Sequence, residues 1–257
     1  MDDAISGTQA GIAVELRPGV LGPDWSVVTF EAASDALRAR DASRPNLAEK
    51  WAVALDDAED RIWQTVIKLF VELGRAPRSE DIVITSGLDG DNVAIVLRKL
   101  QHRDLLGLSD SGEVLHAYPF TSRQTEHIVE LGGHGLNALC AIDALGAGAM
   151  CGRDIVIQSR CRACGAPIRI LTANRGESLN SVTPPGTVVW HDLSYAGTAA
   201  ASCCPRIAFF CSDQHLNEWL GTTPSRTGRR LSADEALQVG RAIIGPVLEE
   251  PGRLAQA

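Results

Sequence analysis

The stretch LNALCAIDALGAGA, residues 136–149, decides the fold class, because it predicts a helix in the middle of a β-rich region. It is rich in leucine and alanine and has no run of β-branched side chains, which favours a helix over Leu136–Ala149. Four downstream segments are typical of strands: Arg153–Ser159, Pro167–Leu171, Thr187–Trp190 and Arg206–Phe210. Further helices are expected at His215–Leu220 and Ala233–Leu248. The sequence therefore predicts an α+β fold with antiparallel strands.

The region upstream of these strands is dominated by helical periodicity. Apolar residues recur at three- and four-residue steps between Leu47 and Leu73, which is typical of a long amphipathic helix. Shorter helices are expected at 79–84 and 93–100, and a Ser-Asp-Ser-Gly turn makes the segment 105–117 typical of a hairpin. Three helices followed by a hairpin predict a winged-helix-like module over residues 46–118.

Winged helices often bind DNA, so the charge of this module matters. Between Arg75 and Leu105 five basic residues are balanced by five acidic ones, and the whole chain carries Lys+Arg 24 against Asp+Glu 32, a net charge of −8. A neutral module in an acidic chain is poorly suited to a phosphate backbone or an anionic membrane. DNA is therefore a disfavoured partner, and a packing or lid role is expected for the module.

Composition and length place the chain among ordinary globular proteins. Its 257 residues are 45% hydrophobic and 22% charged, which excludes collagen-like, coiled-coil and wholly disordered chains. Residues 1–45 contain scattered glycine and proline and one strand-like segment, Ser26–Phe30, so a partly ordered N-terminal extension is expected. No apolar run approaches the roughly 18 residues that span a bilayer, and the N-terminus is acidic where a signal peptide is basic. A cytoplasmic protein without a membrane partner is expected.

The seven cysteines all lie between Cys140 and Cys211. In a reducing compartment such clustering, together with the odd number, favours metal binding or thiol chemistry over a disulfide framework. The third region of the chain, residues 119–257, therefore carries the expected chemistry.

Cys140 and Asp143 are three residues apart in the predicted helix, so their side chains share one face. A neighbouring carboxylate raises the pKa of a thiol and weakens it as a nucleophile. Such a pair is useful where the carboxyl group collects the thiol proton and delivers it elsewhere. The alternative is a buried cysteine with an aspartate at the solvent edge of the helix, and periodicity alone favours that alternative.

Cys203 and Cys204 are adjacent in the segment Ser202–Phe210, which has the composition of a strand. Successive strand residues point to opposite faces, and Cys203 then falls on the apolar face. If one of the two lines a polar site, strand parity favours Cys204, unless a bulge intervenes. Cys151 and Cys211 are expected to be plain buried thiols.

The segment Cys161-Arg162-Ala163-Cys164-Gly165 lies between two predicted strands, and its glycine can take the left-handed turn of a metal-binding knuckle. One such knuckle supplies half of a four-ligand zinc site. The other half would come from residues that do not repeat the two-residue spacing: Cys203, Cys204, Cys211, His191 and His215. A structural zinc is therefore disfavoured, and each of the six histidines is expected to be an ordinary surface or core residue.

Together these segments resemble the organomercurial (alkylmercury) lyases. That family has a catalytic cysteine and aspartate in a Cys-Ala-Leu-Asp-x-Leu helix, a further cysteine ahead of a Gly-Ala-Pro turn, and a second catalytic cysteine before an aromatic pair and a tryptophan. The matching residues are Cys140-Ala141-Ile142-Asp143-Ala144-Leu145, Cys161 with Gly165-Ala166-Pro167, and Cys204 with Phe209, Phe210 and Trp219. The resemblance is close over about Leu136–Trp219 and loose over the winged helix.

The resemblance implies a lyase core of mixed α/β structure at 119–257 that cleaves a carbon–mercury bond by protonolysis, giving a hydrocarbon and Hg(II). Cys140 and Cys204 would bind mercury as thiolates, and Asp143 would relay the proton, while Cys161 would be a structural thiol. Thiolate is a soft ligand and suits a soft cation such as mercury. No cofactor is implied. The substrate is a small organomercurial, and the Hg(II) product would pass to a low-molecular-weight thiol or to a mercuric reductase.

The sequence departs from the family pattern at several points. Leu139 stands where the family has a tryptophan before the helix cysteine, and Cys164, Cys203 and the N-terminal extension are additional. Cys203, Cys161 and Cys164 are therefore further candidates for mercury or another metal. Two alternative functions stay open: a zinc-binding winged-helix metal sensor or structural protein, and a lyase-like enzyme acting on another small molecule.

Overall fold

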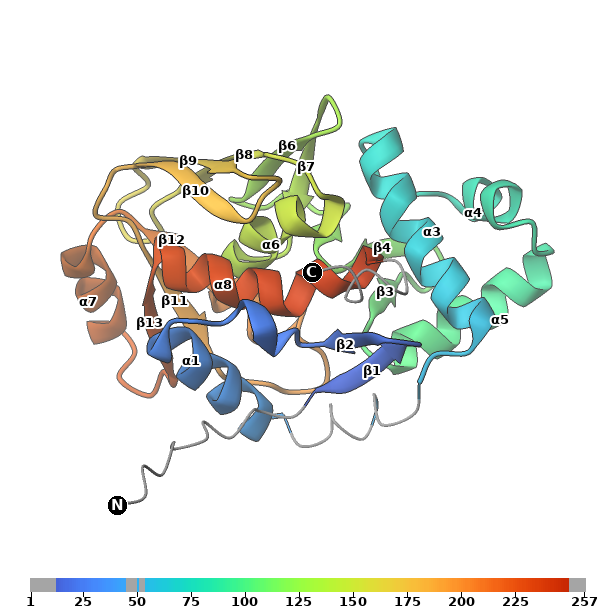
Figure 1. Cartoon of the computed structure of the whole chain (residues 1–257), viewed down its shortest axis with the longest axis horizontal. Coiled ribbons are helices and arrows are strands. Elements are labelled where there is room, and N and C mark those ends of the chain that lie inside the picture. The colour runs from blue at the N-terminus through green and yellow to red at the C-terminus, as the bar shows by residue number, and fades with distance from the viewer. Residues whose placement is uncertain (1–12, 45–49, 51–53, 250–257) are drawn as a thin grey trace, which may run out of the picture.

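An eight-stranded antiparallel sheet organises the molecule. The computed structural model describes residues 13–44, 50 and 54–249. The strand order is β10-β9-β8-β6-β7-β5-β4-β3, and all neighbouring strands are antiparallel (Figure 1). The strands are β3 (Leu106–Leu108), β4 (Val114–Ala117), β5 (Phe120–Thr121), β6 (Ile128–Leu131), β7 (His134–Ala138), β8 (Val156–Arg160), β9 (Pro167–Ala173) and β10 (Ser178–Thr183). The prediction of an α+β fold with antiparallel strands is confirmed.

A second sheet and three helices complete the part of the molecule that carries the cysteines. Strand β11 (Val188–Asp192) lies between β12 (Ala208–Phe210) and β13 (Gly228–Ser232), and α7 (Asp213–Gly221) follows β12. Helix α6 (Ala141–Cys151) packs on α8 (Ala233–Ile244), which η3 (Gly245–Leu248) continues. A Cβ on Gly146 of α6 would lie 2.5 Å from the carbonyl oxygen of Gly240 in α8. The two helices can therefore approach this closely only because both positions are glycine.

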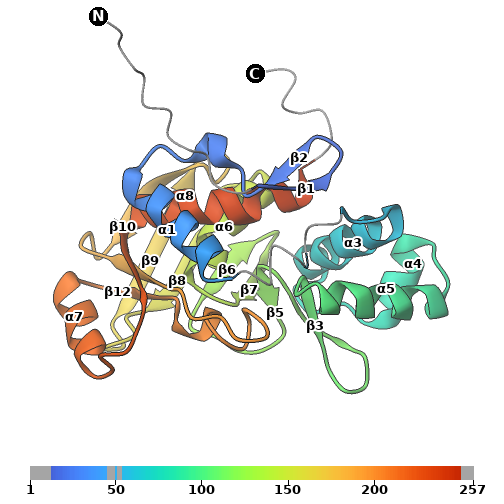
Figure 2. The ribbon, with the colours of Figure 1, turned by 90° about the horizontal axis from the view of Figure 1, so that it is seen from below.

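The N-terminal extension contains a helix that the sequence analysis missed. Strands β1 (Val14–Arg17) and β2 (Val20–Gly22) lead to a short 3-10 helix, η1 (Trp25–Val27), and then to α1 (Glu31–Ala42), which packs on α8 (Figure 2). The expected strand at Ser26–Phe30 is wrong, because the Asp24 side chain accepts a hydrogen bond from the Ser26 N–H and turns the chain. The sequence gives little signal for α1, because its buried residues are two alanines, one leucine and one arginine, which form a weak apolar period.

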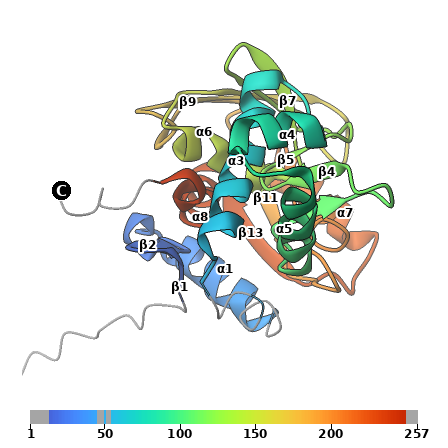
Figure 3. The same cartoon turned by 90° about the vertical axis from the view of Figure 1, so that its right-hand side faces the viewer.

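Three helices gather at one end of the molecule: α3 (Asp57–Leu73), α4 (Ser79–Ser86) and α5 (Gly90–His102) (Figure 3). Helix α3 begins later than its apolar period indicates. The Asp56 side chain accepts a hydrogen bond from the Glu59 N–H, and the Glu59 carboxylate accepts one from the Asp56 N–H. This capping box fixes the start of the helix. Leu47 and Trp51, at the start of the expected helix, lie outside the described residues.

Most of the elements expected after the helices are present. The four predicted strands correspond to β8, β9, β11 and β12, and the last two predicted helices to α7 and to α8 with η3. The sequence does not reveal strands β6 and β7, because both are short and the turn that joins them contains two glycines, Gly132 and Gly133. Among the described residues no helix is both long and apolar enough to cross a membrane.

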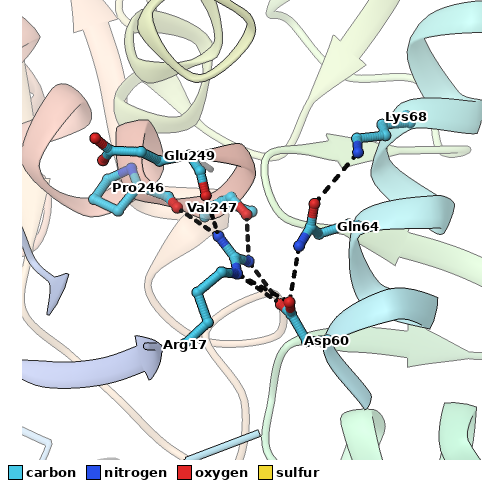
Figure 4. Close-up of polar contacts among 7 residues, drawn as sticks. All are labelled: Arg17, Asp60, Gln64, Lys68, Pro246, Val247 and Glu249. Carbon is cyan, nitrogen blue, oxygen red and sulfur yellow. Dashed lines mark hydrogen bonds and ion pairs between the residues drawn. The ribbon is translucent and has the colours of Figure 1, made fainter. Parts of the chain in front are cut away.

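Arg17 joins three parts of the chain in a single buried cluster (Figure 4). Its guanidinium donates to both carboxylate oxygens of Asp60 in α3, at 2.7–3.0 Å. It also donates to the carbonyl oxygens of Pro246, Val247 and Glu249 at the C-terminal end. The Arg17 side chain is 3% exposed. Arg17 therefore links the N-terminal extension both to α3 and to η3, which follows α8.

We expect Arg17→Met to lower the free energy of unfolding by about 3 kcal/mol, because it removes the cation that pairs with Asp60 and the side chain that donates to three carbonyl groups. Chemical denaturation followed by circular dichroism measures the change. Lys99→Met is the matched control. Lys99 forms an ion pair with Asp56 in which both side chains are 51% exposed. Exposed pairs contribute less than about 1 kcal/mol. An equal loss of unfolding free energy in the two variants would contradict the stabilising role proposed for the Arg17 contacts.

Candidate active site

Cys140 lies two residues after the end of β7 and is the N-cap of α6. Its Sγ accepts a hydrogen bond from the backbone N–H of Asp143 at 3.4 Å. The expected helix over Leu136–Ala149 is wrong in its first turn, because residues 134–138 form β7 and pair with β6. The cap nevertheless brings the two side chains together, with 2.9 Å between Cys140 Sγ and Asp143 Oδ2. Both are buried, which excludes an aspartate at the solvent edge of the helix.

The segment that carries Cys203 and Cys204 is not a strand. Cys204–Arg206 forms a short 3-10 helix, η2, with Pro205 near its start, and β12 begins only at Ala208. Proline cannot donate to a sheet ladder, which disfavours a strand here. Strand parity therefore does not apply to the two cysteines, and their placement depends on the turn.

The turn places Cys204 beside Asp143, whereas Cys203 lines the same pocket next to Arg44. Cys204 Sγ lies 4.0 Å from Asp143 Oδ2, the oxygen that also faces Cys140. The ligand atoms of Cys140, Asp143 and Cys204 all lie within 4.8 Å of one another. Cys203 Sγ instead accepts a hydrogen bond from Arg44 Nη2 at 2.9 Å. Two thiols thus converge on one carboxylate oxygen in a buried site.

Asp104, which follows α5, holds the loop that precedes the two cysteines. One carboxylate oxygen accepts hydrogen bonds from the Tyr195 hydroxyl at 3.0 Å and the Ala199 N–H at 2.9 Å, and the other accepts one from the Tyr118 hydroxyl at 3.1 Å. The Tyr118 hydroxyl in turn accepts from the Ala200 N–H. The helical region therefore helps to position Cys204.

The electrostatics of the site keep a proton available near neutral pH. Burial raises the pKa of the Asp143 carboxyl to about 7, against the opposing effects of the Cys140 hydrogen bond and of the Arg44 and Arg40 guanidinium groups. Burial also raises the pKa of the Cys140 thiol to about 11. Contact with the Cys140 sulfur, together with burial, raises the pKa of Cys204 well above its usual value. Without a metal both thiols stay protonated, whereas Asp143 can take up or release a proton.

The pocket around this triad draws residues from distant parts of the chain. It encloses about 640 Å³, including its mouth, and is lined largely by apolar side chains. Sequence reasoning missed several polar lining residues: Arg40 in α1, Arg44 just after it, Trp63 in α3, Asp104 after α5 and Tyr118 after β4. His191 of β11, which the sequence offered only as a zinc ligand, also lines the pocket. Arg40 and Arg44 are four residues apart, but Arg44 lies beyond the last residue of α1, so this helical spacing gave no usable signal. The extension thus supplies two cations beside Asp143.

The other predicted metal-binding residues lie in a second cluster. Cys161 and Cys164 do not join Cys140; their sulfur atoms lie near Cys211 Sγ and His215 Nδ1, and the four atoms are within 4.8 Å of one another. The expectation of a plain buried Cys211 is wrong, because it is half-buried and its Sγ lies 2.9 Å from His215 Nδ1. No periodicity or fixed spacing in the sequence connects the two halves of this cluster.

Known proteins resemble the chain in both sequence and structure. The family model described as "MerB: Alkylmercury lyase" matches residues 120–245. An alkylmercury lyase of Bacillus cereus is 31% identical over 181 residues, which are 69% of this chain and 78% of that protein. An alkylmercury lyase of Pseudomonas putida is 28% identical over 193 residues, which are 75% of this chain and 87% of that protein.

A solved structure shares the fold. The crystal structure of the mercury-bound form of MerB2 superposes with a TM-score of 0.66 and 24% sequence identity. The match covers 81% of this chain and 98% of that one. Almost the whole of that fold is therefore present here.

Proposed function

The chain belongs to the alkylmercury lyase family, and we propose that Cys140, Asp143 and Cys204 perform its chemistry. The protein is an enzyme that cleaves the carbon–mercury bond of organomercurials. One observation carries the assignment of the residues: two buried thiols converge on a single oxygen of a carboxyl group whose pKa is about 7. Two soft ligands and a proton carrier are what protonolysis of that bond requires.

The two thiols capture the mercury of the substrate R–Hg–X. Coordination to a metal cation removes the proton of a thiol outright, so the high pKa of Cys140 does not prevent thiolate formation once mercury arrives. The first Cys–Hg bond displaces X, which leaves with the thiol proton as HX. The second cysteine then adds to the same mercury atom, and electron donation from two sulfurs polarises the carbon–mercury bond.

Asp143 carries the second thiol proton to the carbon. Its carboxylate oxygen lies 2.9 Å from Cys140 Sγ and 4.0 Å from Cys204 Sγ, so it can accept the proton that the second cysteine loses. The protonated carboxyl group then donates that proton to the leaving carbon, the carbon–mercury bond breaks, and RH is released. The products are a hydrocarbon and Hg(II) held between Cys140 and Cys204, and Asp143 is again ionised.

Release of Hg(II) needs another thiol, because two thiolates hold a soft cation tightly. A low-molecular-weight cellular thiol or a mercuric reductase supplies it, and no other cofactor takes part in the scheme. Because the mechanism needs reduced cysteines, we place the enzyme in the reducing cytoplasm.

We also propose that the chain comprises an extension at 1–45, a winged-helix-like module at 46–118 and a lyase core at 119–257. In this scheme the first two parts cover and shape the pocket, since Arg44 and Trp63 line it and Asp104 holds the Cys204 loop. These contacts support a packing or lid role for the module, and its balanced charge disfavours DNA.

Release of benzene from phenylmercury in the presence of excess thiol tests this function directly. We expect benzene in the headspace, measured by gas chromatography, in an amount that grows with enzyme and substrate. Protein that binds phenylmercury without releasing benzene would contradict the function.

We expect Arg44→Met to move the acid limb of the pH profile to higher pH. Asp143 must be ionised to accept a proton, so the rate of hydrocarbon release rises with pH through its pKa of about 7. The Arg44 cation lowers that pKa, and its removal raises it. Single-turnover rates across the pH range measure the shift, with Arg38→Met as the control, since Arg38 pairs with Asp35 and is not among the pocket-lining residues. An unchanged limb would remove Arg44 from the tuning of Asp143.

A further inference from the structure

The second cysteine cluster is assembled from two segments that are distant in the sequence. Cys161 and Cys164 come from the turn between β8 and β9, whereas Cys211 and His215 come from the end of β12 and the first turn of α7. All four ligand atoms lie within 4.8 Å of one another. Among the described residues no carboxylate joins this group, which is separate from the Cys140, Asp143 and Cys204 triad. Three cysteines and one histidine are a common ligand set of structural zinc sites.

The distances between these atoms are close to those of a tetrahedral zinc site. Zinc binds sulfur at about 2.3 Å, so two sulfur ligands at tetrahedral corners lie about 3.8 Å apart. Cys164 Sγ and Cys211 Sγ are 3.8 Å apart, and Cys161 Sγ is 3.9 Å from His215 Nδ1. The 2.9 Å contact between Cys211 Sγ and His215 Nδ1 is shorter than these two distances, as a hydrogen bond between them would make it. We propose that Cys161, Cys164, Cys211 and His215 bind one structural Zn²⁺.

The backbone at both segments is shaped for a metal. Gly165 has φ +73°, its N–H donates to the Cys161 carbonyl at 2.8 Å, and the Cys161 N–H donates to the Ala166 carbonyl. This tight turn directs both cysteines of the Cys-x-x-Cys motif to one point. On the other segment the Ser212 side chain caps α7 by accepting from the His215 N–H, which fixes the histidine in the first helical turn. The sequence alone disfavours zinc, because only the Cys-x-x-Cys half of the site can be recognised there.

The zinc would stabilise the wall of the active-site pocket. Arg162, inside the motif, donates its N–H to the Phe209 carbonyl at 3.0 Å and its Nη1 to the Pro205 carbonyl at 2.9 Å. Pro205 follows Cys204 directly, and Phe209 lies in β12. Zinc thus fixes the turn that carries one of the two mercury-binding cysteines. This last consequence rests on the proposed function, whereas zinc binding itself does not.

Metal content of the purified protein tests the proposal without any organomercurial. The full chain, expressed with zinc in the medium and kept reduced, is expected to contain one zinc per chain by inductively coupled plasma mass spectrometry. Cys164→Ser combined with His215→Gln should lose it. Cys151→Ser, which changes a cysteine outside both clusters, and Cys140→Ser combined with Cys204→Ser should keep it. Cobalt substituted for zinc should give the visible absorption of a tetrahedral thiolate site in the parent and not in the Cys164/His215 variant.

Three results would overturn the zinc proposal. The first is a parent protein that contains no zinc and takes up neither zinc nor tetrahedral cobalt in a titration. The second is zinc that survives loss of Cys164 and His215 but disappears with Cys140 and Cys204, which would place the ion in the active site. The third is a disulfide between Cys164 and Cys211 in protein taken directly from cells, found by non-reducing mass spectrometry. A failure of benzene release with full zinc content would count against the proposed function alone.

Discussion

Replacing either Cys140 or Cys204 by serine is expected to abolish hydrocarbon release from phenylmercury. One remaining thiolate can bind the mercury, but it cannot supply the second sulfur that polarises the carbon–mercury bond, and a serine hydroxyl is a hard and poor ligand for a soft cation. Each variant should still bind phenylmercury, with one bond to the remaining cysteine. Single-turnover benzene release measures the loss, and mass spectrometry of the intact protein measures the binding.

Cys203→Ser is the matched control, since it changes the neighbouring residue of the same turn. Its sulfur faces Arg44 at 2.9 Å and does not belong to the group of atoms around Asp143. We expect this variant to keep most of the activity, because a serine oxygen also accepts a hydrogen bond from an arginine. An inactive Cys203→Ser together with an active Cys204→Ser would show that the two cysteines have been assigned the wrong way round.

The position of Cys204 could be predicted from the sequence, although the reasoning behind that prediction was only partly right. Strand parity and the resemblance to the family both favoured Cys204 over Cys203, and the structure brings Cys204 to Asp143. The reason differs from the predicted one, because Pro205 opens a 3-10 turn and no strand is present there. The predicted contact between Cys140 and Asp143 is likewise present, although Cys140 caps the helix and does not lie within it. Residues three apart meet at a helix start as they do within a helix, so a local spacing is a robust guide.

Contacts between distant segments were beyond the reach of the sequence. Arg44 reaches the pocket from just beyond α1, a helix with only one large apolar side chain on its buried face and therefore little periodic signal. Cys211 and His215 join the Cys-x-x-Cys motif only because β12 and the turn after β8 meet in space. Each half looks unremarkable alone, since a single half-site is not a metal centre. Spacing along the chain predicts contacts between nearby residues, whereas contacts between distant segments become visible only in the folded structure.

Asp143→Asn is expected to leave mercury binding intact and to slow hydrocarbon release by roughly a hundred- to ten-thousand-fold, the usual contribution of a general acid–base group. Asparagine keeps the size and one acceptor oxygen of the aspartate, but it cannot take up and return a proton at neutral pH. Single-turnover benzene release measures the chemical step. Because the carboxyl group is gone, the remaining slow rate should also lose the rise with pH that the Asp143 pKa of about 7 imposes on the parent.

A stability measurement separates this loss of catalysis from damage to the fold. Burial raises the pKa of Asp143 above its usual value of 3.8. As pH rises through the interval from that value to about 7, the unfolded state ionises first, and the folded parent loses stability relative to it. Asparagine has no such cost, so at pH above neutrality the variant should be at least as stable as the parent in thermal unfolding. Asp110→Asn, at an exposed turn, is the control that should change neither property. A stable Asp143→Asn enzyme that works within about twofold of the parent rate, far short of a general acid–base loss, would remove Asp143 from the mechanism.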